Sequence, residues 1–154
     1  MLKNKSLRIT EIFSSIQGET SKIGLPTIFI RLTGCPLRCQ YCDTSYAFYG
    51  GEIMFFEDII HQVKQFDYKD ICVTGGEPLA QPNSKQLLKD LVDLDFQVSL
   101  ETGGSINIEG IDERVKIIMD IKTPDSGELT KNRWKNIELL KKSDELKFVI
   151  CSIE

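Results

Sequence analysis

Three cysteines lie close together in the stretch GCPLRCQYCDT. Cys35, Cys39 and Cys42 have the spacing C-x₃-C-x₂-C. A structural zinc site takes four ligands, usually as two pairs, and the sequence contains no second pair. Three thiolates can instead hold a four-iron cluster and leave one iron without a protein ligand. Because an open metal position is typical of reactive sites, this spacing favours a [4Fe–4S] cluster whose fourth iron binds a substrate or cofactor.

Other residues could complete a zinc site, so that alternative stays open. His61 lies beside apolar residues in a predicted helix, and Cys72 lies in an apolar strand, where a cysteine is usually part of the core. Cys151 lies near the end of the sequence. Serine-triad chemistry is poorly supported, because the chain has one histidine and no G-x-S-x-G motif.

Composition sets the broad class of protein. The 154 residues are 41% hydrophobic and 27% charged, which fits one folded domain over residues 1–154. A net charge of −4 argues against a general nucleic-acid or membrane-surface binder. The sequence has no long apolar run and no signal-peptide pattern at its start. Five cysteines, three of them in one loop, favour a reducing compartment, so we expect a cytoplasmic protein.

Strand-like and helix-like segments alternate along the chain and must position this loop. Short β-branched segments predict strands at 7–13, 27–33, 70–74, 96–100, 115–121 and 147–150. Apolar residues at helical spacing predict helices at 57–65 and 87–94, the second capped by Asn83 or Ser84. A third helix is expected at 133–142. This order is typical of an α/β fold with a mostly parallel sheet and helices outside it. The stretches GCPLRCQYCDT, TGGEP, ETGG and DIKTPDSG each follow a strand, where such folds place functional loops.

Two of these stretches resemble motifs of the radical S-adenosylmethionine (SAM) superfamily: CPLRCQYC resembles its cluster motif, and VTGGEP resembles its glycine-rich turn. The resemblance implies a partial (β/α)₆-type barrel in which the amino and carboxylate groups of SAM chelate the open iron. It places Tyr41 near the adenine, and Gly76 and Glu77 near the methionine amino group. The cofactors carry the chemistry, so no catalytic side chain is expected. The other residues expected at the SAM pocket are Cys42, Asp43, Thr102, Asp120, Ile121 and Lys122.

The stretch EIFSSIQGETSKIGLPTIFIRLTGC more narrowly resembles the 7-carboxy-7-deazaguanine synthase family of the deazapurine (queuosine) pathway. That resemblance implies 6-carboxy-5,6,7,8-tetrahydropterin as substrate, and Mg²⁺ held by Thr44. Arg31 has the chemistry to hold a carboxylate through two hydrogen bonds, although a solvated arginine paired with Glu11 or Glu19 is the simpler interpretation of the pattern alone. The residues expected to contact the substrate are Ile16, Gln17, Gly18, Arg31 and Thr74.

The implied reaction is that of a lyase. The reduced cluster cleaves SAM to a 5′-deoxyadenosyl radical, and the substrate becomes 7-carboxy-7-deazaguanine with loss of ammonia. The resemblance further implies an electron donor such as flavodoxin, a homodimer, and no nucleic-acid or membrane partner. Family members continue past the last predicted strand, so we expect the C-terminal part of the fold to be missing here. The alternatives are an activating enzyme that makes a glycyl radical on a partner protein, and a metal-binding remnant without catalysis.

Overall fold

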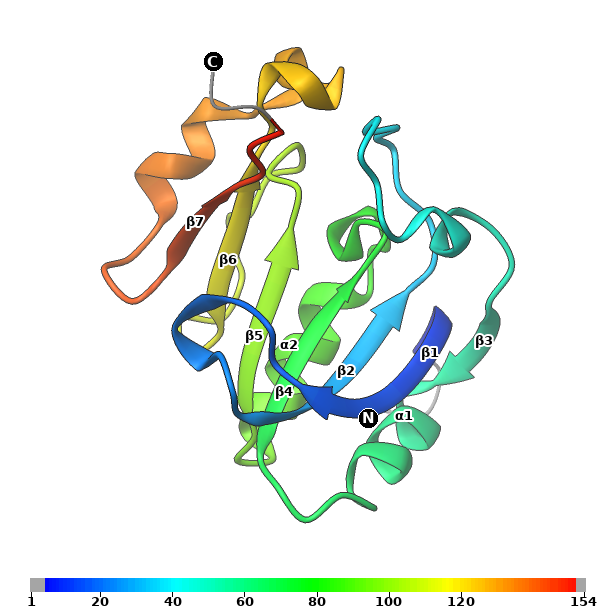
Figure 1. Ribbon diagram of the computed structural model, residues 1–154. Helices are drawn as coiled ribbons and strands as arrows, with labels where there is room; N and C mark the ends of the chain where they lie inside the picture. The colour runs from blue at the N-terminus through cyan, green and yellow to red at the C-terminus, as the bar shows by residue number, and fades with distance from the viewer. Residues whose placement is uncertain (1–4, 152–154) are drawn as a thin grey trace.

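Seven strands form one open, twisted sheet in the order β3-β1-β2-β4-β5-β6-β7 (Figure 1). The computed structural model describes residues 5–151, so both ends of the expected domain 1–154 lie outside the described residues. Strand β1 pairs antiparallel with β2 and with β3, whereas β2, β4, β5, β6 and β7 run parallel. The strands are β1 (Ser6–Ile16), β2 (Pro26–Leu32), β3 (Glu52–Phe55), β4 (Asp70–Gly75), β5 (Gln97–Thr102), β6 (Lys116–Ile121) and β7 (Glu145–Phe148).

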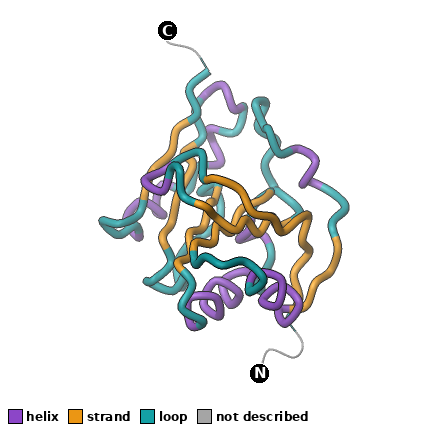
Figure 2. The backbone as a smooth tube through the Cα atoms, turned by 60° about the horizontal axis from the view of Figure 1, so that its bottom comes forward, coloured by secondary structure: helices purple, strands orange, loops and turns teal. Residues whose placement is uncertain are grey.

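The expected α/β fold with a mostly parallel sheet is confirmed, and the sheet does not close into a barrel. The described residues contain two α-helices, α1 (Phe56–Val63) and α2 (Ser84–Asp93), which lie on one side of the sheet (Figure 2). The sequence predicted β1 too short, because this strand continues as a long antiparallel partner of β2. Strand β3 was not expected, since EIMF offers only four residues.

The α-helix predicted at 133–142 is wrong: this segment contains one 3₁₀ helix, Trp134–Leu139. Asn136 is fully buried, and its side-chain amide donates to the carbonyl oxygens of Gly104 at 3.0 Å and Ile106 at 2.8 Å. The segment is thus fixed by a polar anchor to the loop after β5. Trp134 and Leu139 in this segment are exposed. The last strand also begins two residues earlier than expected, at Glu145.

Helix α2 begins without the predicted side-chain cap. Asn83 occupies the N-cap position, but its side-chain amide donates to the carbonyl of Ser6 at 3.1 Å. Ser84 is buried, and its hydroxyl has no hydrogen-bond partner among the described residues. Asn83 therefore joins the start of α2 to β1, and tertiary contact takes precedence over local capping.

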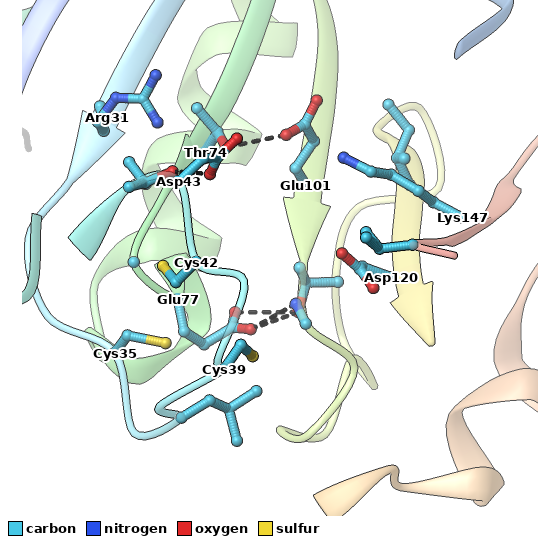
Figure 3. Close-up of a pocket in the computed structure, with 18 of the residues that line it drawn as sticks. Arg31, Cys35, Cys39, Cys42, Asp43, Thr74, Glu77, Glu101, Asp120 and Lys147 are labelled. Atoms are coloured by element: carbon cyan, nitrogen blue, oxygen red, sulfur yellow. Dashed lines mark hydrogen bonds between the residues drawn. The ribbon is translucent and has the colours of Figure 1, made fainter. Parts of the chain in front are cut away.

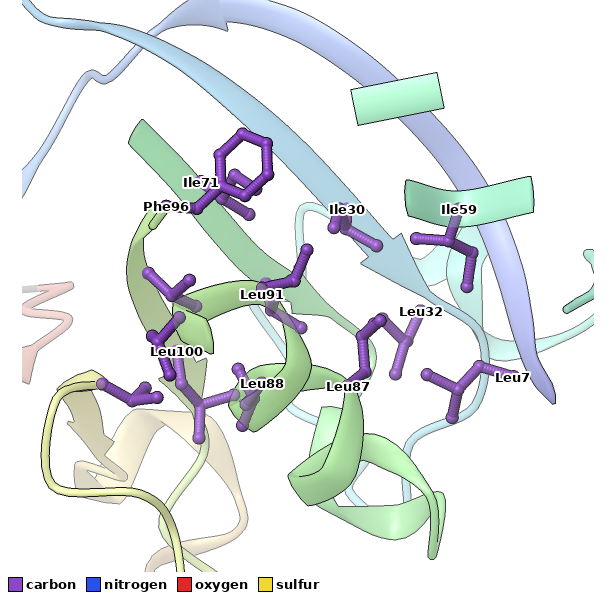
Figure 4. Close-up of a cluster of buried hydrophobic side chains, with 14 of the residues drawn as sticks. Leu7, Ile30, Leu32, Ile59, Ile71, Leu87, Leu88, Leu91, Phe96 and Leu100 are labelled. Carbon is purple, nitrogen blue, oxygen red and sulfur yellow. The ribbon is translucent and has the colours of Figure 1, made fainter. Parts of the chain in front are cut away.

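The hydrophobic core lies between the sheet and the two helices (Figure 4). Leu87, Leu88 and Leu91 form the buried stripe of α2, and all three are fully buried. They pack on the sheet face formed by residues such as Ile30 on β2 and Leu100 on β5. Successive side chains of a strand point to opposite faces, so the alternate residues of these strands face away from the helices.

That opposite face of the sheet carries polar side chains. Arg31 on β2 pairs with Thr74 on β4, and Asp120 on β6 pairs with Lys147 on β7. Figure 3 shows Arg31, Thr74, Glu101, Asp120 and Lys147 on one side of the strands. The hydrophobic alternation of the parallel strands thus leaves a polar surface away from the helices. The loop that follows β2 borders this surface.

Candidate active site

A cavity of about 500 Å³ lies on the polar face of the sheet, and all three loop cysteines line it (Figure 3). Its volume is within the usual range for a site that binds a small molecule or cofactor. The turns that follow β4 and β5 also contribute to its wall, through Gly76 and Gly103. This is the edge where parallel strands of an open α/β sheet present their carboxyl ends.

The cysteine loop is fastened to the protein on both sides. The backbone N–H of Gly34 donates to the carbonyl of Ala47 at 2.8 Å, and that of Gln40 donates to Ser126 at 3.0 Å. The backbone N–H of Arg38 donates to the Glu128 carboxylate at 2.6 Å, and the Arg38 guanidinium lies over the Phe48 ring, 4.3 Å from its centroid. These contacts attach the loop to the rest of the protein before Cys35 and again between the cysteines, at Arg38 and Gln40.

The three cysteines are unpaired thiols, partly buried in the cavity wall. Burial raises the pKa of the Cys35 and Cys39 thiols, and the nearby Lys122 partly offsets this at Cys39. A metal must therefore displace protons from these thiols when it binds. Among residues 5–151, no three His, Cys, Asp or Glu side chains are close enough to hold a single metal ion.

The glycines of the TGGEP turn allow its backbone to contact the cysteine loop. A Cβ atom at Gly76 would lie 2.1 Å from the Gly34 carbonyl oxygen and 3.0 Å from the Cβ of Cys35. Gly75 has a φ of +128°, a conformation that other residues rarely adopt. Only glycine fits at Gly76, so this turn and the base of the cysteine loop form one close-packed unit.

Glu77 joins this turn to the turn after β5. Its side chain is fully buried, and its carboxylate accepts hydrogen bonds from the N–H of Leu79 at 3.0 Å and of Gly103 at 2.8 Å. The Thr102 hydroxyl lies 2.9 Å from both carboxylate oxygens. Burial raises the pKa of Glu77, although these hydrogen bonds and Lys122 act in the opposite direction. In this structure Glu77 holds the two glycine turns in register.

Lys122 and Asp120 line the cavity across from the cysteine loop. Their charged atoms, Nζ and Oδ2, are 3.2 Å apart. Burial alone would lower the pKa of Lys122, but Asp120 and Cys39 raise it overall, so the side chain is a cation. Within the described part of the chain, the buried Tyr41 hydroxyl and Asp120 Oδ1 have no hydrogen-bond partner. These polar atoms could bind a polar ligand in the cavity.

Figure 3 shows Arg31 and Thr74 at the end of the cavity away from Cys35 and Glu77. Gln17 also lines the cavity. The Arg31 Nε donates to the Glu11 carboxylate at 2.8 Å, and the Thr74 hydroxyl donates to Glu101 at 3.0 Å. Gln17 is buried at the start of the loop after β1. These residues thus add hydrogen-bond donors and acceptors to the cavity wall.

The loop after β1, residues 17–25, crosses the polar face of the sheet and contacts its far strands (Figure 1). Glu19 forms an ion pair with Lys147 on β7, and the backbone N–H of Ser21 donates to Glu145 at 3.2 Å. Lys22 forms an ion pair with Asp70 at the start of β4. This loop therefore closes the cavity from the side opposite the cysteine loop, and it brings Gln17 and Gly18 to the wall.

Most of the residues expected from the sequence line this one cavity, and two do not. Ile16 is largely exposed at the end of β1, and Ile121 is buried in the hydrophobic core. His61, Cys72 and Cys151 also lie outside the cavity wall. The expected residues that do line the cavity are Gln17, Gly18, Arg31, Cys35, Cys39, Tyr41, Cys42, Asp43, Thr44, Thr74, Gly76, Glu77, Thr102, Asp120 and Lys122.

Sequence reasoning missed Lys147, Glu19 and the aromatic Phe48 as parts of the wall. Burial alone would lower the pKa of Lys147, but its hydrogen bond with Glu19 and the charge of Glu101 raise it. The sequence does offer one indication for Lys147: it lies between apolar Leu146 and Phe148 on β7. Neighbouring residues of a strand point to opposite faces, so Lys147 lies on the polar face of the sheet. Glu19 could not be assigned, because its position depends on how the loop after β1 crosses the sheet.

The donor set fits an iron–sulfur cluster and a polar cofactor. Three thiols line the cavity, glycine backbone borders them, and buried polar atoms of Tyr41 and Asp120 lack partners within residues 5–151. The sequence profile of the Radical SAM superfamily matches residues 29–150, which include the cysteine loop and both glycine turns. The crystal structure of QueE from Escherichia coli has the same fold, with a TM-score of 0.64 and 22% identity over 94% of this chain and 84% of that one. Fold, site and profile together define a radical SAM enzyme.

Two relatives identify the family within the radical SAM superfamily. The 7-carboxy-7-deazaguanine synthase of Chlorobaculum tepidum is 46% identical over 149 residues, covering 95% of this chain and 68% of the relative. That of Thermoplasma acidophilum is 43% identical, covering 92% of this chain and 69% of the relative. The chain belongs to the 7-carboxy-7-deazaguanine synthase family, whose members are radical SAM lyases of 7-deazapurine biosynthesis. None of the helices in the described part of the chain is both long and apolar enough to cross a membrane.

Proposed function

We propose that this protein converts 6-carboxy-5,6,7,8-tetrahydropterin to 7-carboxy-7-deazaguanine and ammonia, using a [4Fe–4S] cluster, SAM and Mg²⁺. One observation carries the proposal: three free thiols and the cationic side chain of Arg31 line the same cavity. Substrate and products balance in atoms, because the substrate differs from the deazaguanine by one ammonia. The conversion is thus a rearrangement with elimination, and it needs no net oxidant.

Each end of the cavity has its own role in this proposal. Cys35, Cys39 and Cys42 hold the cluster and leave one iron for SAM, which supplies one-electron chemistry when bound. The SAM side of the wall consists of residues that follow the cysteine loop and strands β4, β5 and β6. These residues are Tyr41, Asp43, Gly76, Glu77, Thr102, Asp120 and Lys122.

Arg31 and Thr74 form the substrate side. A guanidinium held on a strand can bind a carboxylate through two parallel hydrogen bonds, which fixes the position of the pterin ring. The Gln17 side chain offers both a donor and an acceptor for the edge of that ring. Residues of the loop after β1 and the aromatic Phe48 also line the cavity.

Thr44 holds Mg²⁺ in this proposal. Its hydroxyl lies in the cavity wall and donates to the neighbouring Asp43 carboxylate at 2.6 Å. Oxygen atoms are the ligands that Mg²⁺ prefers, and substrate oxygens can complete its octahedron. Held by Thr44, the cation would supply positive charge that stabilises negative charge as the ring rearranges. A small one-electron carrier such as flavodoxin would reduce the cluster.

The test is to supply anaerobically reconstituted protein with the carboxylated tetrahydropterin, SAM, Mg²⁺ and a chemical reductant. We expect one equivalent of ammonia for each 7-carboxy-7-deazaguanine, both measured by chromatography and a coupled assay. Arg31→Met is the matched control, because it removes the carboxylate partner and leaves all three loop cysteines in place. An intact cluster that cleaves SAM without forming deazaguanine would contradict the proposed substrate.

A further inference from the structure

Arg31 is held by three neighbouring groups on the polar face of the sheet. Glu11 is its cross-strand partner on β1, and the Glu11 carboxylate accepts a hydrogen bond from Arg31 Nε at 2.8 Å. The Tyr46 hydroxyl donates to the same carboxylate oxygen, also at 2.8 Å. The guanidinium lies near two aromatic rings, 5.7 Å from the centroid of Phe13 and 5.7 Å from that of Tyr46.

The aromatic side of this arrangement is itself supported. Phe13 and Phe29 are paired residues of β1 and β2, and their rings stack with centroids 5.1 Å apart. Tyr46 comes from the short 3₁₀ turn Ser45–Phe48, directly after the cysteine loop. The guanidinium is therefore fixed both from the sheet and from the loop that carries the cysteines and Thr44.

Glu11 accepts a hydrogen bond from Nε of Arg31 and leaves its two Nη groups available. Among residues 5–151, the hydrogen bond to Glu11 engages Nε, and neither Nη atom donates to a protein acceptor. A guanidinium bound through Nε still presents its two Nη groups as a fork that matches a carboxylate. The Arg31 side chain lines the cavity and is 16% exposed, whereas that of Glu11 is 39% exposed and is not part of the wall. Figure 3 shows the guanidinium projecting from β2 on the same side of the sheet as Thr74 and Glu101.

We propose that Glu11 and Tyr46 are positioning residues that hold Arg31 by Nε and aim its two Nη groups at the substrate carboxylate. This inference rests on the proposed function, in which Arg31 binds that carboxylate. Tyr46 also joins the carboxylate site to the turn that follows Thr44, so the substrate and the metal side of the cavity share one support.

The direction in which carboxylate affinity changes when Glu11 is replaced shows whether Glu11 positions Arg31 or only neutralises its charge. Glu11 carries a negative charge close to the site of an anionic substrate. If it only neutralised Arg31, both Glu11→Ala and Glu11→Gln would strengthen carboxylate binding. If it positions Arg31, Glu11→Ala must weaken binding, since a free arginine side chain loses more entropy on binding. Glu11→Gln must retain binding, because an amide oxygen still accepts a hydrogen bond from Nε.

The experiment measures dissociation constants by anaerobic calorimetry, using the holoenzyme with cluster, SAM and Mg²⁺. The two probes are 6-carboxy-tetrahydropterin and 6-methyl-tetrahydropterin, which lacks the carboxylate. We expect Glu11→Ala to raise the dissociation constant of the carboxylated probe about tenfold and to leave that of the methyl probe unchanged. In Glu11→Gln, the dissociation constant of the carboxylated probe should stay within about threefold of wild type. Tyr46→Phe keeps the ring and loses the hydroxyl, so an intermediate loss of about threefold for the carboxylated probe is expected.

Several outcomes would overturn the inference. They are unchanged or tighter binding by Glu11→Ala, equal weakening of both probes, or equal weakening by Glu11→Ala and Glu11→Gln. Arg31→Met separates this inference from the proposed function. If Arg31→Met does not change the preference for the carboxylated probe, both fail. If Arg31→Met abolishes that preference but Glu11→Ala and Tyr46→Phe leave it unchanged, the positioning inference alone fails.

Discussion

Gly76→Ala is expected to damage the cysteine loop through a backbone clash. The new Cβ would lie 2.1 Å from the Gly34 carbonyl oxygen, 2.5 Å from its carbon and 3.0 Å from the Cβ of Cys35. Backbone atoms cannot move aside as a flexible side chain can, so the turn and the loop must separate. Overpacking of this kind costs about 1–3 kcal/mol. For a domain of this size that corresponds to a melting temperature lower by about 2–12 °C.

The consequence for the metal is larger than that for folding. Metal–thiolate bonds require specific distances, and the clash bears directly on Cys35. We expect the variant to retain less than about half of the wild-type iron and sulfide after anaerobic reconstitution, while its far-ultraviolet circular dichroism remains native. Iron and sulfide analysis, together with thermal unfolding of the metal-free protein, measures both effects.

Gly18→Ala is the matched control, because a Cβ at Gly18 meets no atom within 4 Å. It should keep the wild-type melting temperature and iron content. Wild-type stability and iron content in Gly76→Ala would refute the close packing of turn and loop. Equal losses in both variants would show that the effect is not specific to this contact.

Three further predictions concern the site and its supports. Replacing any one of the three loop cysteines with alanine should abolish the cluster absorbance at ~400 nm, whereas Cys72→Ala should retain it. Loss of that absorbance in Cys72→Ala would contradict the assignment of the three loop cysteines as the cluster ligands. Thr102→Val removes the hydroxyl that donates to buried Glu77, so urea unfolding should show a loss of about 1–3 kcal/mol, and an unchanged midpoint would argue against that contact. Partial burial alone would raise the pKa of Glu145, but hydrogen bonds from Lys116 and Ser21 lower it overall. These contacts therefore stabilise the folded state at pH values above the unfolded pKa of 4.5. That stabilisation is lost as the pH falls through the lowered pKa of the folded state. The protection of the Ser21 amide against hydrogen exchange, measured relative to its intrinsic rate, should therefore fall in acid. A protection factor that does not change with pH would contradict this.

Local patterns predicted the parallel part of the sheet well. Buried strands such as β4 and amphipathic helices such as α2 follow from hydrophobic periodicity, which depends on local spacing alone. The segment 133–142 has the same kind of pattern, yet Asn136 fixes it to the loop after β5. A polar anchor of this kind depends on contacts distant in sequence, so no local signal reveals it.

The site was predictable where its motifs are continuous in sequence. The cysteine loop and the TGGEP turn each lie within a few residues, so spacing and residue type identify them. Ile16 and Ile121 were expected at the cavity from motif position, but strand alternation and burial direct these side chains elsewhere. Lys147 belongs to the wall because β7 pairs with β6 and the loop after β1 reaches across to it. Such placement depends on the assembled sheet.

The most direct test is electron paramagnetic resonance of the reduced, anaerobically reconstituted protein before and after addition of SAM, with iron, sulfide and zinc measured on the same sample. Three cysteine ligands and an open iron predict about four iron and four sulfide per chain, and a cluster spectrum that changes when SAM binds. About one zinc per chain without sulfide, or a cluster spectrum that SAM leaves unchanged, would contradict the assignment of this loop.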